Sequence, residues 1–110
     1  MDIYDKNSDP FKQIIKGFCK RNNISPQKPR FDIIENTVAI SMKNHLKDGI
    51  DLECFKILNV IYQIIGPLGI KFTQQLTCFS NSERVDRVTV SLKKEDYDAF
   101  NIRMKDNGSI

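Results

Sequence analysis

The sequence has few of the residues that metal and disulfide sites require. It contains one histidine, His45, and three cysteines, Cys19, Cys54 and Cys78, of which no two have C-x-x-C spacing. A tetrahedral zinc site needs about four nitrogen or sulfur ligands at typical spacings, so we expect no metal centre and no other cofactor. Each cysteine lies among apolar residues, which favours reduced thiols in the core of an intracellular protein.

Signals for export and for membrane insertion are also lacking. The first ten residues, MDIYDKNSDP, carry acids where a signal peptide has positive charge followed by an apolar run. The longest apolar-rich segment, residues 58–70, is interrupted by Asn59 and Gln63 and broken at Gly66-Pro67, so it is too short to span a bilayer. We therefore expect an intracellular protein, cytoplasmic or nuclear, with no signal peptide and no membrane span.

Signatures of catalysis are missing as well. No glycine-rich loop precedes a predicted helix in the form that binds phosphate. A nucleophile–base pair would have to use His45, which lies in the polar segment MKNHLKDG and is expected to be solvated. The carboxylates within residues 51–53 and 95–98 lie near predicted helix N-termini, where the helix dipole alone favours acids. The sequence thus predicts a protein that is not an enzyme and has no small-molecule substrate.

The chain has the size and composition of one globular domain. It has 110 residues, of which 40% are hydrophobic and 28% are charged. We expect a flexible N-terminal tail over residues 1–9, a single domain over residues 10–104 and a flexible C-terminal tail over residues 105–110.

Hydrophobic periodicity predicts a helix near each end of this domain. The first is expected to begin after a cap at Ser8 or Asp9, with Pro10 as its first residue. A short third helix is expected from the i, i+3, i+7 spacing of Tyr97, Phe100 and Met104. The residues that form the apolar stripe of the first helix are Phe11, Ile14, Ile15, Phe18 and Cys19.

The central helix gives the strongest helical pattern in the sequence. It is expected between a cap at Asp48 or Asp51 and a stop at Gly66-Pro67. Apolar residues occupy nearly all of its circumference between residues 52 and 65. Such a wide stripe predicts a helix buried on most sides, either against the first helix or against a second copy of the protein.

Two β-hairpins are expected between these helices. The segment RFDIIENTVAISM turns at Glu35-Asn36, where asparagine tolerates the left-handed conformation of a tight turn and glutamate is a poor partner for it. This register places four residues on one buried face, in the pairs Ile33 with Val38 and Phe31 with Ile40.

The second hairpin joins residues 70–79 to residues 84–92 through a four-residue loop at Ser80–Glu83. In this register Cys78 faces Val85. Keeping Val88 on the same face as Val85 requires one extra residue, so we predict a β-bulge at Asp86–Arg87.

The resulting order, α-ββ-α-ββ-α, predicts an α+β fold. It consists of a small antiparallel β-sheet of two hairpins, with helices packed on one face. The other face would be polar and mildly basic, without the row of exposed aromatics that stacks single-stranded bases. Sequence-specific reading of RNA by stacking is therefore disfavoured.

The segment from Pro10 to Arg30 contains six positive charges and no acid, in a chain whose net charge is +3. Lysine follows lysine at i, i+4, which slightly destabilises an isolated helix and so favours an anionic partner. Nucleic acid is the commonest such partner, and an acidic protein or an anionic membrane are alternatives. The same row is equally typical of the solvated side of a surface helix. The predicted nucleic-acid-binding residues are Lys12, Lys16, Lys20, Arg21, Lys28 and Arg30.

Two main hypotheses of function follow. The first is a small non-enzymatic binding module, a dimer or an assembly subunit, that contacts the nucleic-acid backbone through the basic N-terminal helix and linker. The alternative is a protein–protein interaction or adaptor module that docks a partner through the apolar central helix or a sheet edge, with no nucleic acid. A third reading, attachment of the first helix to a membrane surface, uses apolar residues that are more simply explained as core.

Overall fold

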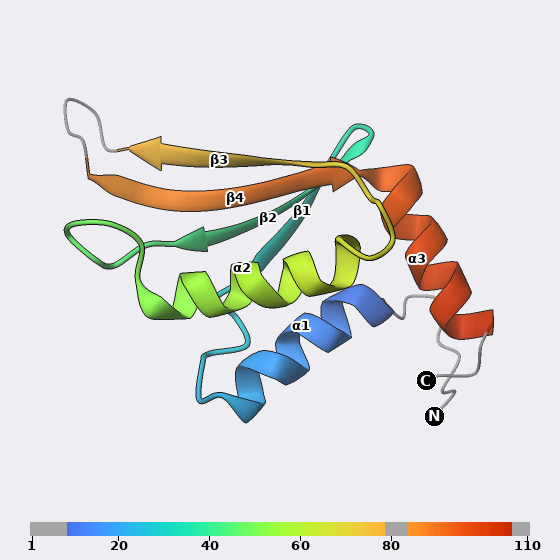
Figure 1. The fold of residues 1–110 in the computed structure, drawn as a ribbon, viewed down its shortest axis with the longest axis horizontal. Helices are drawn as coiled ribbons and strands as arrows, with labels where there is room; N and C mark the ends of the chain where they lie inside the picture. The colour runs from blue at the N-terminus through green and yellow to red at the C-terminus, as the bar shows by residue number, and fades with distance from the viewer. Residues whose placement is uncertain (1–8, 79–83, 107–110) are drawn as a thin grey trace.

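The computed structural model describes residues 9–78 and 84–106 (Figure 1). The expected loop at Ser80–Glu83 and most of the two expected tails lie outside the described residues, while Lys105 and Asp106 belong to the last helix. The elements are α1 (Pro10–Arg21), β1 (Arg30–Ile34), β2 (Thr37–Lys43), α2 (Leu52–Ile65), β3 (Phe72–Cys78), β4 (Val85–Lys93) and α3 (Lys94–Asp106). Their order confirms the predicted α-ββ-α-ββ-α fold.

The four strands form one antiparallel sheet in the order β1-β2-β4-β3. The two hairpins are therefore joined side by side through β2 and β4. In Figure 1, α1 and α2 lie on one side of the sheet and α3 lies at the end where β4 stops. α1 packs against both α2 and α3. Within the described residues, no helix is long and apolar enough to cross a membrane.

An aspartate caps each of the first two helices. Asp9 caps α1 and Asp51 caps α2, and each is one of the two residues predicted for its cap. The Asp9 carboxylate accepts a hydrogen bond from the backbone N–H of Lys12 at 3.0 Å, and Pro10 is the first helical residue. Asp9 also accepts from the Tyr97 hydroxyl at 2.5 Å and from the Asn101 amide at 3.0 Å. One residue thus caps α1 and ties its start to α3.

The first hairpin has the predicted register, in which Ile33 pairs with Val38 and Phe31 pairs with Ile40. Val38 and Ile40 are buried, but the expectation of a fully buried face is wrong for Ile33, which is 62% exposed. β1 is an edge strand, so Ile33 has a neighbouring strand on one side only. In the turn, Glu35 takes the left-handed conformation, with φ of 56°.

The second hairpin contains the predicted bulge. Thr77 pairs with Arg87, whereas the next residue, Cys78, pairs with Val85. Asp86 is therefore the extra residue of β4, as the alternation of valines required.

The core lies between the sheet and the helices. It contains Cys54, Ile57, Leu58, Ile61 and Ile65 of α2 together with Phe11, Ile15 and Cys19 of α1 and the inward residues of β2 and β4. Cys19 and Cys54 are fully buried as predicted, but Cys78 is exposed, which corrects the expectation of three core thiols.

The edge strand β3 lies outside this core, and every one of its residues is exposed. α2 packs against α1 as expected, but it is not buried on most sides, because Leu52 is 65% exposed and Phe55 is 63% exposed. The helix layer covers the inward residues of β2 and β4 and leaves β3 open to solvent.

Candidate functional site

Four of the six predicted basic residues make contacts within the chain. The Lys28 side chain is only 8% exposed, and its ammonium lies 3.2 Å from the carboxylates of both Asp51 and Glu53. The Lys16 ammonium donates to the backbone carbonyl of Pro26 at 2.6 Å. These lysines hold the linker after α1 against the helices.

Two further cations of the set lie beside β1. The Arg30 guanidinium pairs with Asp32 at 3.1 Å, with both side chains largely solvated. The Lys12 ammonium lies 5.7 Å from the centre of the Phe31 ring, within the range of a cation–π contact.

Lys20 and Arg21 are exposed in the last turn of α1. Within the described residues, neither forms an ion pair. Positive charge is favoured there by the helix dipole. The structure therefore places the six predicted residues along α1, the linker and β1 rather than in one cluster.

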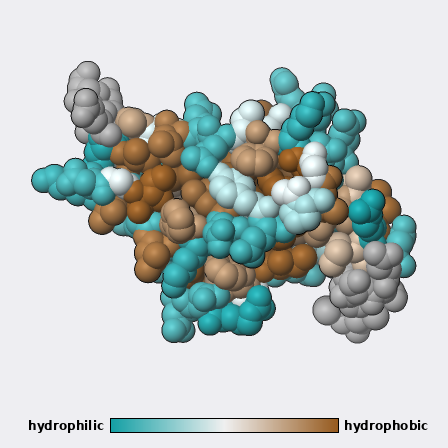
Figure 2. Space-filling view, in the orientation of Figure 1, coloured by the Kyte–Doolittle hydropathy of each residue, from teal (hydrophilic) through white to brown (hydrophobic). Residues whose placement is uncertain are grey.

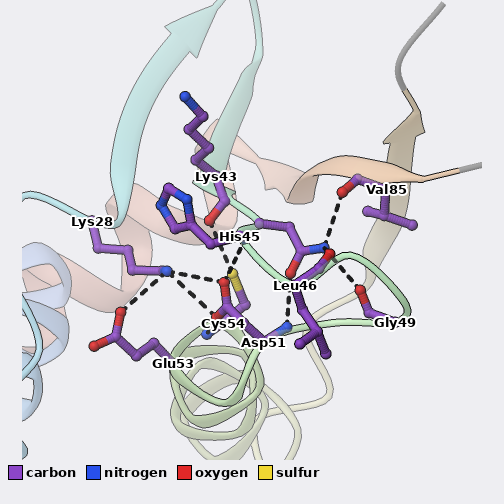
Figure 3. A network of polar contacts seen from close by, with 10 residues as sticks. Lys28, Lys43, His45, Leu46, Gly49, Asp51, Glu53, Cys54 and Val85 are labelled. Atoms are coloured by element: carbon purple, nitrogen blue, oxygen red, sulfur yellow. Dashed lines mark hydrogen bonds and ion pairs between the residues drawn. The ribbon is translucent and has the colours of Figure 1, made fainter.

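A polar network surrounds the start of α2 (Figure 3). The Asp51 carboxylate caps the helix by accepting from the backbone N–H of Cys54 at 2.8 Å, and it also accepts from the backbone N–H of His45 at 2.8 Å. The Lys28 ammonium completes the network from the linker after α1. The linker after α1, the segment after β2 and the start of α2 therefore meet at one carboxylate.

The electrostatics of this network follow from its hydrogen bonds. Burial by itself raises the pKa of Asp51, but the N–H groups of Cys54 and His45 and the Lys28 ammonium outweigh it and lower the pKa to about 2. Burial raises the pKa of the Cys54 thiol to about 12, so this thiol stays protonated and is a poor nucleophile at neutral pH. These contacts fasten the linker after α1 and the segment after β2 to the start of α2.

Asn44 lies beside this network and was not among the functional residues predicted from the sequence. Its side chain is buried, and its amide nitrogen donates to the backbone carbonyls of Leu46, Gly49 and Val85 at 3.2, 2.8 and 2.9 Å. Its amide oxygen accepts from the backbone N–H of Asp51 at 2.7 Å. No local sequence signal distinguishes this asparagine from an ordinary loop residue, because its burial depends on the packing of its loop against Val85 of β4.

Exposed apolar side chains gather where α2 and β3 face solvent. Leu52 and Phe55 lie on the same flank of α2 as Tyr62, within an arc of about 80°. Tyr62 stacks on Phe72 with ring centres 4.9 Å apart, and its hydroxyl donates to the Gln74 side chain. We call this surface the α2–β3 face, and its members are Leu52, Phe55, Tyr62, Phe72, Gln74 and Leu76.

The apolar side chains of the α2–β3 face are partly exposed to solvent. Phe72 and Leu76 are 43% and 46% exposed, although they point to the same side of the sheet as the buried valines of β4. Figure 2 shows apolar side chains gathered between β3 and α2 on the side turned to the viewer, divided by hydrophilic residues. Exposed apolar patches bordered by polar residues are typical of interaction sites in soluble proteins.

The outer backbone edge of β3 lies beside this face. The strand reads FTQQLTC and contains no charge, proline or glycine. Natural edge strands are usually protected against pairing by charges, prolines or bulges. The strand at the opposite edge of the sheet, β1, carries the charged residues Arg30 and Asp32. Apart from the bulge beside its last residue, β3 lacks these protections, so it is the edge of the sheet that is open to strand pairing.

The described residues contain no group of three or more histidine, cysteine or acidic side chains arranged to hold a metal ion. A hollow of about 660 Å³ lies between the β1–β2 turn and the start of α3. Its charged residues include Lys94 and Asp98, which form an ion pair at 2.6 Å, and its lining has no histidine or cysteine.

Comparisons of the chain with protein-family models, with curated proteins and with solved structures found no match.

Proposed function

We propose that this protein is a small non-enzymatic interaction module that associates with a second copy of itself through the α2–β3 face. The observation that carries the proposal is the exposure of Phe55, Phe72 and Leu76 beside an uncharged strand edge. Apolar side chains and unpaired backbone groups at one place are the two elements that strand addition uses.

The chemistry of β3 favours a second copy as the occupant. If two β3 strands pair antiparallel about Gln75, Thr73 faces Thr77 and Gln74 faces Leu76 of the other copy. No like charges meet along the strand, and each partner supplies the same surface, as an isologous twofold interface requires. The sheet would then continue through both copies and the two open flanks of α2 would lie on the same side of it.

The free energy gained by burying these apolar side chains is of the size expected for a reversible dimer. Completely burying a large apolar side chain stabilises by about 1.5–3 kcal/mol, so each half-exposed member contributes roughly 1 kcal/mol. Leu52, Phe55, Phe72 and Leu76 from two copies together contribute on the order of 8 kcal/mol, which is comparable to the entropic cost of association. Backbone hydrogen bonds along β3 therefore supply the net affinity.

Sedimentation equilibrium at protein concentrations up to on the order of 100 µM tests the proposal. We expect the wild type to dimerise and Gln75→Lys to be monomeric, because two lysines would then face each other at the centre of the new pairing. The matched control is Thr89→Lys, which adds the same charge on the neighbouring position of β4, away from the edge. A monomeric wild type, or equal dimerisation of the two variants, would contradict the proposal.

Contact with the nucleic-acid backbone remains a second candidate function. It is favoured by the acid-free segment from residue 10 to residue 30 and by the exposure of Lys20 and Arg21 at the end of α1. Fluorescence anisotropy with random-sequence DNA and RNA tests it. Lys20→Gln with Arg21→Gln is expected to weaken binding and flatten its salt dependence, whereas Lys47→Gln with Arg103→Gln removes the same charge elsewhere. Equal binding by both double variants would refute this role for the end of α1.

A further inference from the structure

Two cations lie opposite each other on the two central strands of the sheet, where β2 ends. Lys43 of β2 and Arg87 of β4 are direct cross-strand partners. Like charges in this position destabilise a strand pair. Within residues 9–78 and 84–106, neither cation forms an ion pair with a carboxylate, and the Arg87 guanidinium donates instead to the neutral hydroxyl of Ser41 at 3.3 Å. The fold therefore retains a repulsive pair where a single acid would have removed the repulsion.

The same two side chains line a hollow of about 410 Å³ at the end of β2. Figure 3 shows Lys28, Lys43, His45 and Glu53 around this end of the strand. The charged and imidazole groups of the lining are Lys28, Arg30, Lys43, His45, Glu53 and Arg87. Of the four cations, Lys28 is paired with Asp51 and Glu53 at 3.2 Å, and Arg30 is paired with Asp32 at 3.1 Å. Within the described residues, Lys43 and Arg87 are therefore the lining cations without a carboxylate partner.

We propose that this hollow binds a phosphate group, with Lys43, Arg87 and Arg30 as its direct contacts. A guanidinium presents parallel N–H donors that match phosphate oxygens, and a lysine adds a point charge. A phosphate between Lys43 and Arg87 converts their repulsion into two attractions. The Arg30–Asp32 pair is exposed and engages Arg30 through Nε, so the terminal N–H groups of that guanidinium are not used by this pair.

The size of the hollow allows more than a bare anion. Its volume lies in the range of small-molecule sites, so a phosphate group carried by a nucleotide or by a nucleic-acid backbone also fits. The site does not depend on the proposed dimer, because its residues come from the linker, β1, β2, β4 and the start of α2 rather than from β3.

The primary experiment is an NMR titration of the isotope-labelled protein with inorganic phosphate at low ionic strength. We expect saturable shifts of the backbone amide signals of Lys43, His45 and Arg87. These shifts are expected to disappear in the variant that combines Lys43→Gln with Arg87→Gln. They are expected to persist in the control that combines Lys20→Gln with Arg21→Gln, which removes the same charge from the end of α1. The absence of saturable shifts in the wild type, or equal loss in the two variants, would overturn the proposal.

Folding of the Lys43→Gln, Arg87→Gln variant is checked by its amide spectrum, which should keep the dispersion of the wild type. A second variant, Arg87→Lys, retains the charge and removes the guanidinium fork, so it should bind phosphate more weakly without losing it. Phosphate affinity unchanged in both variants would equally overturn the proposal.

Two further probes separate the sources of the phosphate group. Anisotropy of a labelled single-stranded DNA of about 12 nucleotides reports backbone phosphate. If the hollow holds nucleic acid, DNA affinity falls roughly tenfold in the Lys43→Gln, Arg87→Gln variant and not in the Lys47→Gln, Arg103→Gln control. If it holds a small phosphorylated ligand, a nucleoside triphosphate competes with inorganic phosphate and DNA affinity is equal in the two variants. Sedimentation equilibrium of the same samples reports self-association separately.

Discussion

The ammonium of Lys28 lies 3.2 Å from the carboxylate of Asp51, the residue that caps α2. Their side chains are 8% and 15% exposed, so the pair is shielded from the screening that weakens surface ion pairs. Lys28 belongs to the linker after α1, and the pair therefore fastens that linker to the start of the central helix.

We expect Asp51 to make the free energy of unfolding depend on pH in the acidic range. The pKa of Asp51 is lowered from 3.8 to about 2, so its stabilising contribution is complete above pH 3.8 and is lost as the pH falls towards 2. The shift corresponds to about 2 kcal/mol. Urea unfolding between pH 5 and pH 2 should show this loss in the wild type and a flatter profile for Asp51→Asn, which keeps a capping side chain without the charge. Parallel pH profiles of the two proteins would argue against the assignment.

Asn44 is expected to be the most sensitive polar residue of the fold. Asn44→Asp keeps the shape of the side chain but turns a carboxylate oxygen towards three backbone carbonyls. We expect a loss of about 3 kcal/mol or more in the free energy of unfolding, measured by urea denaturation. The exposed neighbour change Lys47→Gln should stay within about 0.5 kcal/mol. Similar effects of the two substitutions would mean that the network does not stabilise the protein.

Glu35 is expected to carry backbone strain in the β1–β2 turn. It adopts φ of 56°, a conformation that costs a non-glycine residue roughly 1–2 kcal/mol. Glu35→Gly should therefore raise the free energy of unfolding by about 1 kcal/mol, as measured by thermal or urea unfolding. Asn36→Gly is the matched control, because Asn36 does not adopt a positive φ and gains only chain flexibility. The interpretation fails if the two glycine variants change stability in the same direction.

Phe55 is expected to matter for association and not for folding of the single copy. Its side chain is 63% exposed, so Phe55→Ser should change the free energy of unfolding of the single copy by less than about 1 kcal/mol. The same change should weaken self-association by roughly tenfold, which sedimentation equilibrium measures. Ile61→Ser, on the buried side of α2, is the contrasting variant and should destabilise the fold itself. Unchanged association of Phe55→Ser would remove α2 from the proposed interface.

The repulsion between Lys43 and Arg87 is expected to be measurable in the free protein. Lys43→Glu replaces a like-charge pair by an opposite pair across β2 and β4. We expect stabilisation by about 0.5 kcal/mol at low salt, with the gain shrinking as salt is added. Lys47→Glu makes the same charge change in the exposed loop before α2 and serves as the control. A destabilised Lys43→Glu protein would show that the pair is not repulsive in this setting.

The local structure of this protein follows from short segments of its sequence. The cap predicted at Ser8 or Asp9 is Asp9, and α2 stops at Gly66 as predicted. The pairing of Ile33 with Val38 is confirmed, and the bulge predicted at Asp86–Arg87 has Asp86 as its extra residue. Each depends on side-chain periodicity, capping or turn geometry within a short segment, and these preferences act before any long-range contact forms.

The covered surfaces and the charge pairs, in contrast, depend on how distant segments pack together. The pairing of β2 with β4 places Lys43 opposite Arg87, and the packing of the linker against α2 buries Lys28 beside Asp51. The helix layer stops short of β3, so Phe72 and Leu76 stay exposed although they point to the same side of the sheet as the buried residues of β4. A period of two in the sequence tells which residues share a face, but the coverage of that face depends on the position of helices that are distant in the chain.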